Sequence, residues 1–103
     1  MVLQAAFIFL AAGAKPDEHR SVVRTPQVDL VVVGVPDYAQ AEMAAKSLVD
    51  DGVAAIELCG GFGIAGRARI AQAVGSKVAV GVVRFDGHPG LSGKSGDLIF
   101  ATK

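Results

Sequence analysis

The chain has 103 residues, 51% of them hydrophobic and 6% aromatic, with ten basic and ten acidic side chains and a formal net charge of zero. This length suits a single domain, residues 1–103, and the high apolar content excludes a disordered chain. The neutral charge excludes a basic surface for nucleic acid or anionic membrane, and the single cysteine favours a reducing compartment, so we expect a cytoplasmic protein.

Four apolar runs predict buried strands, in chain order Ala5–Ala12, Asp29–Val35, Ala54–Cys59 and Val78–Phe85. Three of the runs are rich in Val, Ile or Phe and are apolar on both faces, which is typical of parallel strands covered on both sides. The first run also has the apolar centre of a signal peptide. No Lys or Arg precedes it and Gln4 interrupts its start, so we interpret it as a strand.

Three segments between these runs predict helices. The clearest spans Pro36–Gly52, where Asp37 is suited to cap the first turn and the final glycine to end the helix. A second helix is predicted over Ala65–Gly75. A shorter third is predicted over Pro16–Thr25, with a proline in its first turn and Pro26 just beyond its end.

Strands that alternate with helices predict βαβ crossovers and a mainly parallel, four-stranded sheet. We favour the strand order 2-1-3-4, with a sequential half-barrel, 1-2-3-4, as the alternative. Two subunits of the half-barrel would cover each other's open edges, and a homo-oligomer is expected with either strand order. Residues 87–103 form a Gly-rich tail, whose apolar end, Leu98–Ala101, is expected to dock on the body or on a neighbouring subunit.

A glycine-rich stretch, Gly60–Gly66, lies between the third strand and the second helix. Its last six residues match the dinucleotide fingerprint G-x-G-x-x-G, and Asp86 follows 20 residues later. The motif lies on the third strand instead of the first, and the 17 residues after Asp86 are too few for a second nucleotide-binding half. We therefore expect the free N–H groups and the helix dipole to bind a phosphate or carboxylate, with a plain tight turn as the alternative. No cofactor is identified.

A second phosphate-like string lies in the tail. Gly93-Lys94-Ser95 imitates the end of a P-loop, but His88 stands where the first glycine is required, and only eight residues follow Ser95. Nucleotide hydrolysis is therefore not expected. Lys94 remains a candidate to close over a bound anion as part of a lid.

Polar side chains gather at the carboxyl ends of the predicted strands, where open parallel sheets bind ligands. Glu57 and Cys59 share a face of the third strand, and Arg84 and Asp86 share a face of the fourth. Arg84 is a candidate to anchor a carboxylate or phosphate, or to form a structural ion pair with Glu57. Glu57 is alternatively a general base.

Cys59 stands just before a helix amino end, a position that activates a thiol, and His88 is a candidate base for it. The alternative is an inert, buried cysteine. His88 with Glu57 and Asp86 is also a conceivable metal group, but no spacing is diagnostic and we predict no metal. The candidate catalytic residues are thus Cys59, Glu57, Asp86 and His88, and the candidate ligand-binding residues are Gly60, Gly61, Phe62, Gly63, Arg84 and Lys94.

Four strings in this chain, AAFIFLAAGAKPDEHRSVVRTP, VVVGVPDY, AIELCGGFG and VGVVRFDGHPGLSGKSGD, are similar to a small, mainly bacterial family, the domain of unknown function 6506. The resemblance covers nearly the whole chain and implies a compact α/β protein of about this length. It implies no activity, so no catalytic role is transferred. It does imply that the glycine loop and the segment Arg84–Asp97 belong together.

Three classes of function follow from these residues. We favour a module that binds a small anionic metabolite at the glycine-rich loop. The first alternative is a small enzyme that uses Cys59 with His88, or Glu57 with Asp86, on such a ligand. The second is a structural or regulatory homo-oligomer without a ligand. Whether the chain is an enzyme is left open.

Overall fold

A computed structural model describes residues 1–85 and 87–101 of the chain. Within them a five-stranded sheet has the order β2-β3-β1-β4-β5. Strands β3, β1, β4 and β5 are parallel, and β2 pairs with β3 in the antiparallel direction. In chain order the elements are β1 (Leu3–Leu10), β2 (Arg20–Arg24), β3 (Val28–Val35), α1 (Tyr38–Asp50), β4 (Ala55–Leu58), α2 (Ile64–Val74), β5 (Ala79–Val82), the short 3-10 helix η1 (Pro89–Leu91) and α3 (Gly96–Phe100).

The four predicted strands are present, and their relative order is the favoured 2-1-3-4. The predicted number of strands is wrong, because β2 adds a fifth strand at the edge of the sheet, next to β3. The half-barrel order is wrong, because the first predicted strand lies between the second and the third.

The predicted helix over Pro16–Thr25 is also wrong. Its first residues form a single turn, in which the N–H groups of Glu18 and His19 donate to the carbonyl of Lys15. Its second half is the edge strand β2, which contains the β-branched pair Val22 and Val23 and is paired along its whole length with β3. Pairing with a neighbouring strand favours β-branched residues in the extended form, and this tertiary contact overrides the local helix signals.

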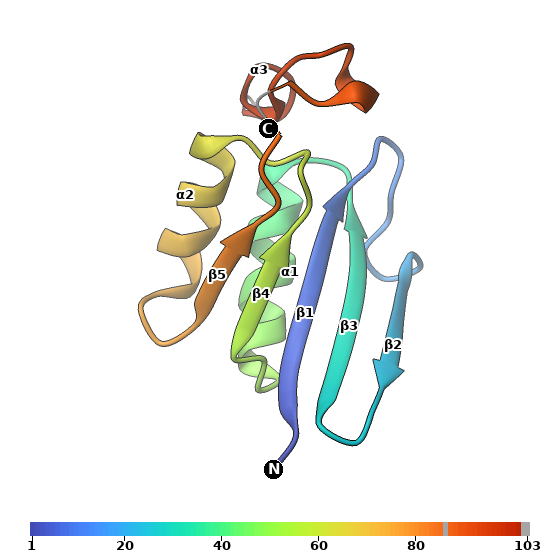
Figure 1. The fold of residues 1–103 in the computed structure, drawn as a ribbon, viewed down its shortest axis with the longest axis vertical. Helices are drawn as coiled ribbons and strands as arrows, with labels where there is room; N and C mark the ends of the chain where they lie inside the picture. Colours follow the sequence, from blue (N-terminus) through green and yellow to red (C-terminus); the bar gives the residue numbers. More distant parts are fainter. Residues whose placement is uncertain (86, 102–103) are drawn as a thin grey trace.

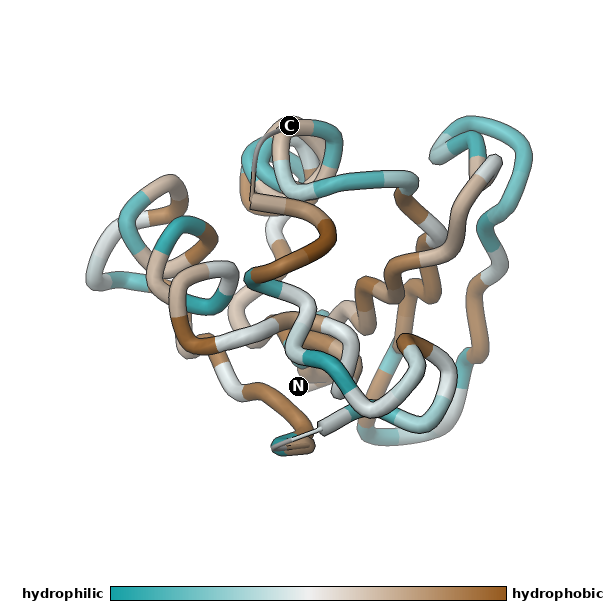
Figure 2. Tube along the Cα trace, turned by 90° about the horizontal axis from the view of Figure 1, so that it is seen from above, coloured by the Kyte–Doolittle hydropathy of each residue, from teal (hydrophilic) through white to brown (hydrophobic). Residues whose placement is uncertain are grey.

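Both long helices lie on the same face of the sheet (Figure 1). The buried core lies between them and that face, while the hydrophilic stretches lie mostly on the outer turns when the chain is seen from above (Figure 2). The core comprises Ala6, Ile8, Val33, Val35, Tyr38, Ala41, Ala45, Leu48, Val53, Ile56, Leu58, Phe62, Ile70, Val78 and Phe100.

The residues predicted to cap or end the two long helices have those roles in the structure. The Asp37 side chain caps α1 by accepting from the N–H of Gln40 at 2.9 Å. Gly52 follows α1 with a φ of 102°, and Gly75 ends α2 with a φ of 80°, both in the left-handed region that favours glycine.

The tail folds over the carboxyl ends of the parallel strands, beside the start of α2 (Figure 1). Phe100 is only 9% exposed and packs against Tyr38, with 5.9 Å between the ring centroids. Leu98 and Ile99 remain exposed. The tail therefore docks on the body of its own chain through one aromatic side chain of α3. No helix in the described part of the chain is long and apolar enough to span a membrane.

Candidate functional site

The amino end of α2 lies at the carboxyl edge of the sheet, where the sequence predicts an anion site. The N–H groups of Ala65 and Gly66 donate to the Asp97 carboxylate at 3.0 and 3.1 Å. The N–H of Gly63 donates to the Tyr38 hydroxyl at 2.9 Å, and that hydroxyl donates to Asp97 at 2.9 Å. This helix start therefore holds an anionic group, and the group is the side chain of Asp97 from the tail.

The glycines of the loop allow the tail and its neighbours to approach closely. A Cβ atom at Gly63 would overlap the Asp97 carboxyl group, and one at Gly66 would overlap the Tyr38 ring. On the other side of the contact, a Cβ atom at Gly96 would overlap the carbonyl oxygen of Gly61. Packing within the chain therefore accounts for these positions of the G-x-G-x-x-G match without a nucleotide.

Burial and hydrogen bonds at the start of α2 shift the pKa values of both Asp97 and Tyr38. Partial burial raises the pKa of Asp97, but the N–H groups of Ala65, Gly66 and Ile64 and the Tyr38 hydroxyl outweigh burial and hold the pKa below its ordinary value of 3.8. Burial, with the adjacent Asp97, raises the pKa of Tyr38 from 10.0 to about 12, against the opposing hydrogen bond from Gly63. At neutral pH the contact is thus a carboxylate bonded to a neutral phenol.

Tyr38 is held in place from several sides. Its ring is fully buried and stacks on Phe62, with 5.5 Å between centroids and an interplanar angle of 8°. The Arg69 guanidinium lies 5.6 Å from the centre of the same ring, and its Nε donates to Glu42 at 2.7 Å. These contacts join α1 to α2 and fix the hydroxyl that bonds Asp97.

A cavity of about 380 Å³ opens beside this contact, between α2, the end of β5 and the tail. Its volume is in the range of small-molecule sites. Its position beyond the carboxyl ends of parallel strands is where open α/β sheets bind ligands. The lining residues are Phe62, Gly63, Ile64, Arg67, Ala68, Val82, Arg84, Phe85, Ser95 and Asp97.

Three predicted ligand-binding residues, Phe62, Gly63 and Arg84, line this cavity. Gly60 does not line the cavity itself. It packs against the ring of Phe85, which does, and a side chain at Gly60 would overlap that ring. Gly61 lies under the tail instead, and its N–H donates to the Cys59 sulfur at 3.4 Å.

The predicted catalytic residues are distributed over different surfaces. Glu57 is exposed on the face of the sheet that is opposite the helices. Cys59 is half-buried, and its sulfur accepts from the N–H of Leu10 at 3.3 Å. Asp86 lies outside the described residues. The structure therefore separates Glu57 from the cavity that Arg84 lines.

His88 is part of the turn structure of the tail. Its Nδ1 accepts from the N–H of Gly90 at 2.9 Å, and its ring lies 4.7 Å from that of Phe85. Its backbone forms an isolated antiparallel bridge with Lys94, which is exposed on the same turn. Among the described residues, no group of three or more His, Cys, Asp or Glu side chains is arranged to hold a metal ion.

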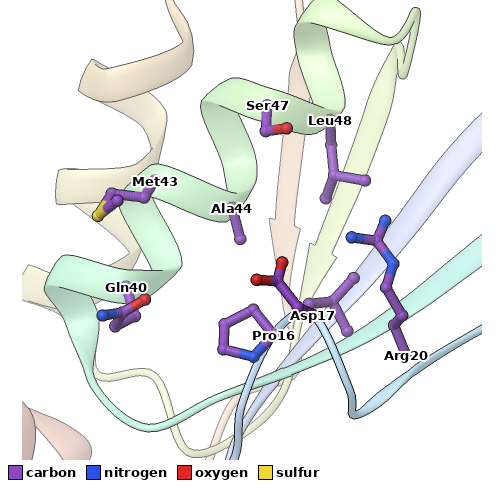
Figure 3. A pocket seen from close by; sticks show the side chains of 9 residues that line it. Pro16, Asp17, Arg20, Gln40, Met43, Ala44, Ser47 and Leu48 are labelled. Atoms are coloured by element: carbon purple, nitrogen blue, oxygen red, sulfur yellow. The ribbon is translucent and has the colours of Figure 1, made fainter.

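A second, smaller cavity of about 240 Å³ lies between α1 and the turn that precedes β2 (Figure 3). Its polar lining comes from Asp17, Arg20, Gln40 and Ser47, all of which are exposed. It is smaller than most ligand sites and lies away from the carboxyl edge beside α2. We therefore regard the larger cavity as the candidate site.

The family model of a family of unknown function, DUF6506, matches residues 3–98. The chain belongs to this family. The resemblance inferred from the four strings is thereby confirmed, and the matched DUF6506 region includes both Tyr38 and Asp97. Comparisons with curated proteins and with solved structures found no match.

Sequence reasoning did not identify Tyr38 or Asp97 as members of the site. In the sequence Tyr38 is one of the apolar residues of the helix predicted over Pro36–Gly52, and a helical pattern does not reveal where a hydroxyl points. The family resemblance was the one feature of the sequence that pointed to a contact between the glycine loop and the tail. It linked the glycine loop with the segment that ends at Asp97, and these two regions are in contact.

Proposed function

We propose that this chain binds a small anionic metabolite in the 380 Å³ cavity beside α2. The observation that carries the proposal is the lining of that cavity, which combines an apolar wall with two arginines at the ligand-binding edge of a parallel sheet. Phe62, Val82 and Phe85 are suited to contact the body of a ligand, and the arginines are suited to its charged group.

The charges of the lining favour an anion. Arg67 and Arg84 contribute two positive charges, and Asp97 contributes one negative charge. The Asp97 carboxylate bonds to the start of α2, so its charge is compensated there. A guanidinium binds a carboxylate or phosphate through two parallel hydrogen bonds, which add both binding energy and geometric specificity.

The anion is expected beside the arginines and not on the N–H groups of the glycine loop. Those of Gly63, Ala65 and Gly66 already have partners within the chain. Arg67 donates to the Val80 carbonyl at 3.3 Å, which holds its side chain along the β5 side of the cavity. This geometry modifies the expectation from the sequence while it keeps the same class of ligand.

Thermal unfolding with a panel of anions tests the proposal. The panel comprises inorganic phosphate, acetate, benzoate and phenyl phosphate, because a mixed lining should prefer an anion that carries an apolar group. A ligand at 100 times its Kd stabilises the folded state by about 2.7 kcal/mol, which raises the Tm of a domain of this size by roughly 10 °C or more. Benzoate or phenyl phosphate should raise the Tm more than acetate or phosphate does.

Three variants locate the site. Arg84→Lys keeps the charge but loses the two-pronged hydrogen bonding, and Arg67→Ala removes one cation from the lining. Lys77→Ala, at the exposed turn before β5, is the matched loss of charge outside the cavity. The first two variants should reduce the ligand-induced shift and the third should keep it. A wild-type protein that no member of the panel stabilises would leave the ligand-free structural role as the better account.

A further inference from the structure

The sheet has one face that the described residues leave uncovered. Helices α1 and α2 lie behind the strands in Figure 1, and the tail lies beyond their upper ends. Sheets whose strands are parallel occur almost only with both faces covered, because their strands are apolar on both sides. Four of the five strands here are parallel, so a second covering layer is expected.

The open face is apolar. The pairing register assigns to it every second residue of each strand, and these residues lie outside the buried core cluster. Val23 is 53% exposed and Leu3 is 45% exposed on this face. Glu57 is the one charged side chain among its strand residues. They are Leu3, Ala5, Phe7, Phe9, Ser21, Val23, Val28, Leu30, Val32, Gly34, Ala55, Glu57, Ala79 and Gly81.

The face divides into a half with large side chains and a half with small ones. Strands β1 and β3 present Phe7, Phe9, Leu30 and Val32, whereas β4 and β5 present Ala55, Ala79 and Gly81 beside Glu57. The register places them in level rows. Leu30, Ala5, Ala55 and Ala79 form one row, and Val32, Phe7, Glu57 and Gly81 form the next.

We propose that the open face is covered by the same face of a second copy of this chain. The two-fold axis runs along the strands between β1 and β4, so that the large half of each copy packs on the small half of the other. Rotation about this axis keeps the rows level, which sets Leu30 opposite Ala79 and Val32 opposite Gly81. A two-fold interface requires such self-complementarity, because each residue pair occurs twice.

The size of the face fits a dimer. The axis sets β1 and β3 of one copy over β4 and β5 of the other and leaves the edge strand β2 outside the contact. Four strands spaced at about 4.8 Å and about 20 Å long give a flat footprint of roughly 400 Å² per copy, or roughly 800 Å² for the pair. The uneven surface of the side chains adds to this footprint and brings the buried area near the ~1,000 Å² at which specific interfaces begin. The contact also covers a patch that is large for the surface of a monomer. The interface leaves the cavity beside α2 on the opposite face free, so it is independent of the proposed ligand site.

Sedimentation equilibrium of the full chain tests the proposal. The wild type should sediment with twice the 10.5 kDa chain mass at micromolar concentration. Leu30→Lys should convert the protein to a monomer without loss of its circular dichroism spectrum, since a charge would then face Ala79. Met43→Lys is the matched control, because Met43 is 65% exposed on the outer side of α1. A monomeric wild type, or a dimer that Leu30→Lys leaves intact, would overturn the proposal.

Cross-linking tests the orientation. Facing sheets lie about 10 Å apart, too far for a disulfide, so a short bis-maleimide is used in a Cys59→Ser background. A mixture of the Leu30→Cys and Ala79→Cys proteins should give a cross-linked heterodimer, while each protein alone should give at least tenfold less dimer. Equal cross-linking of either single variant alone would overturn the two-fold arrangement.

The charge of Glu57 gives a further test of the pairing. Glu57→Gln removes a charge that the dimer buries against Phe7, so the variant should associate more tightly than the wild type. Weaker association would contradict this pairing.

Discussion

The Tyr38 hydroxyl donates a hydrogen bond to Asp97 at 2.9 Å, across 59 positions of the sequence. The same hydroxyl accepts from the N–H of Gly63. One phenol thus joins the start of α1, the glycine-rich loop and the tail. Because the cavity beside α2 is closed on one side by Asp97 and Ser95, this contact also maintains the shape of the candidate site.

Tyr38→Phe tests the importance of that hydroxyl. The ring contacts with Phe62 and Phe100 are retained, whereas the Gly63 N–H loses its acceptor. A stranded buried donor costs about 1–3 kcal/mol. Urea titration at neutral pH should show this loss of unfolding free energy. An unchanged midpoint would mean that water replaces the phenol without cost.

The free energy of unfolding at alkaline pH gives an independent measure of the Tyr38 contact. Its folded-state pKa of about 12 exceeds the ordinary 10.0, so its contribution is fully present below pH 10 and is lost as the pH rises toward 12. Subtraction of the Tyr38→Phe curve from the wild-type curve should reveal this loss. Parallel curves between pH 9 and pH 12 would contradict it.

Asp97→Asn keeps the shape of the side chain and removes its charge. Loss of a capping carboxylate at a helix start costs about 1 kcal/mol, so the variant should be less stable at pH 7. The folded-state pKa of Asp97 lies below 3.8, so its stabilisation is present above that pH and is lost as the pH falls through the folded value. The two proteins should therefore converge in stability in acid. A gap that is as wide at pH 2 as at pH 7 would rule out the carboxylate as its cause.

Gly96→Ala tests the close approach of the tail to the glycine loop. Its Cβ would meet the Gly61 carbonyl oxygen, a backbone atom that cannot rotate away, so the tail should detach from the body. Limited proteolysis followed by mass spectrometry should then cut within residues 87–101 at least several-fold faster than in the wild type. Ser92→Gly is the control, since Ser92 has a φ of 56° that glycine adopts readily, and it should leave the cleavage rate unchanged.

Local patterns were sufficient for much of this fold. The apolar runs predict the four parallel strands, and Asp37, Gly52 and Gly75 predict the limits of α1 and α2. The strand order was the favoured of two alternatives and does not follow from these local patterns. Strand β2 was missed because its extended form depends on pairing with β3, a contact that residues 16–25 alone do not encode.

The sequence predicts a candidate site at the carboxyl edge beside α2, but it does not predict the contacts found at that edge. The glycine loop signals a helix start that is suited to an anion, and the start of α2 holds the carboxylate of Asp97. That the anion belongs to Asp97 depends on how a distant tail folds back, which no local spacing reveals. Glu57 and Arg84 were grouped by their positions near strand ends, whereas the structure directs them to different sides of the sheet.

The proposed anion site is tested most directly by a nitrogen–proton correlation NMR titration of the wild-type chain with phenyl phosphate. Saturable shifts should concentrate on the backbone amides of residues 62–68 and 82–85, which surround the cavity. The amides of Gln40, Met43 and Ser47, at the smaller cavity, should stay unchanged. Shifts centred on that smaller cavity, or no saturable shift at millimolar ligand, would contradict the account.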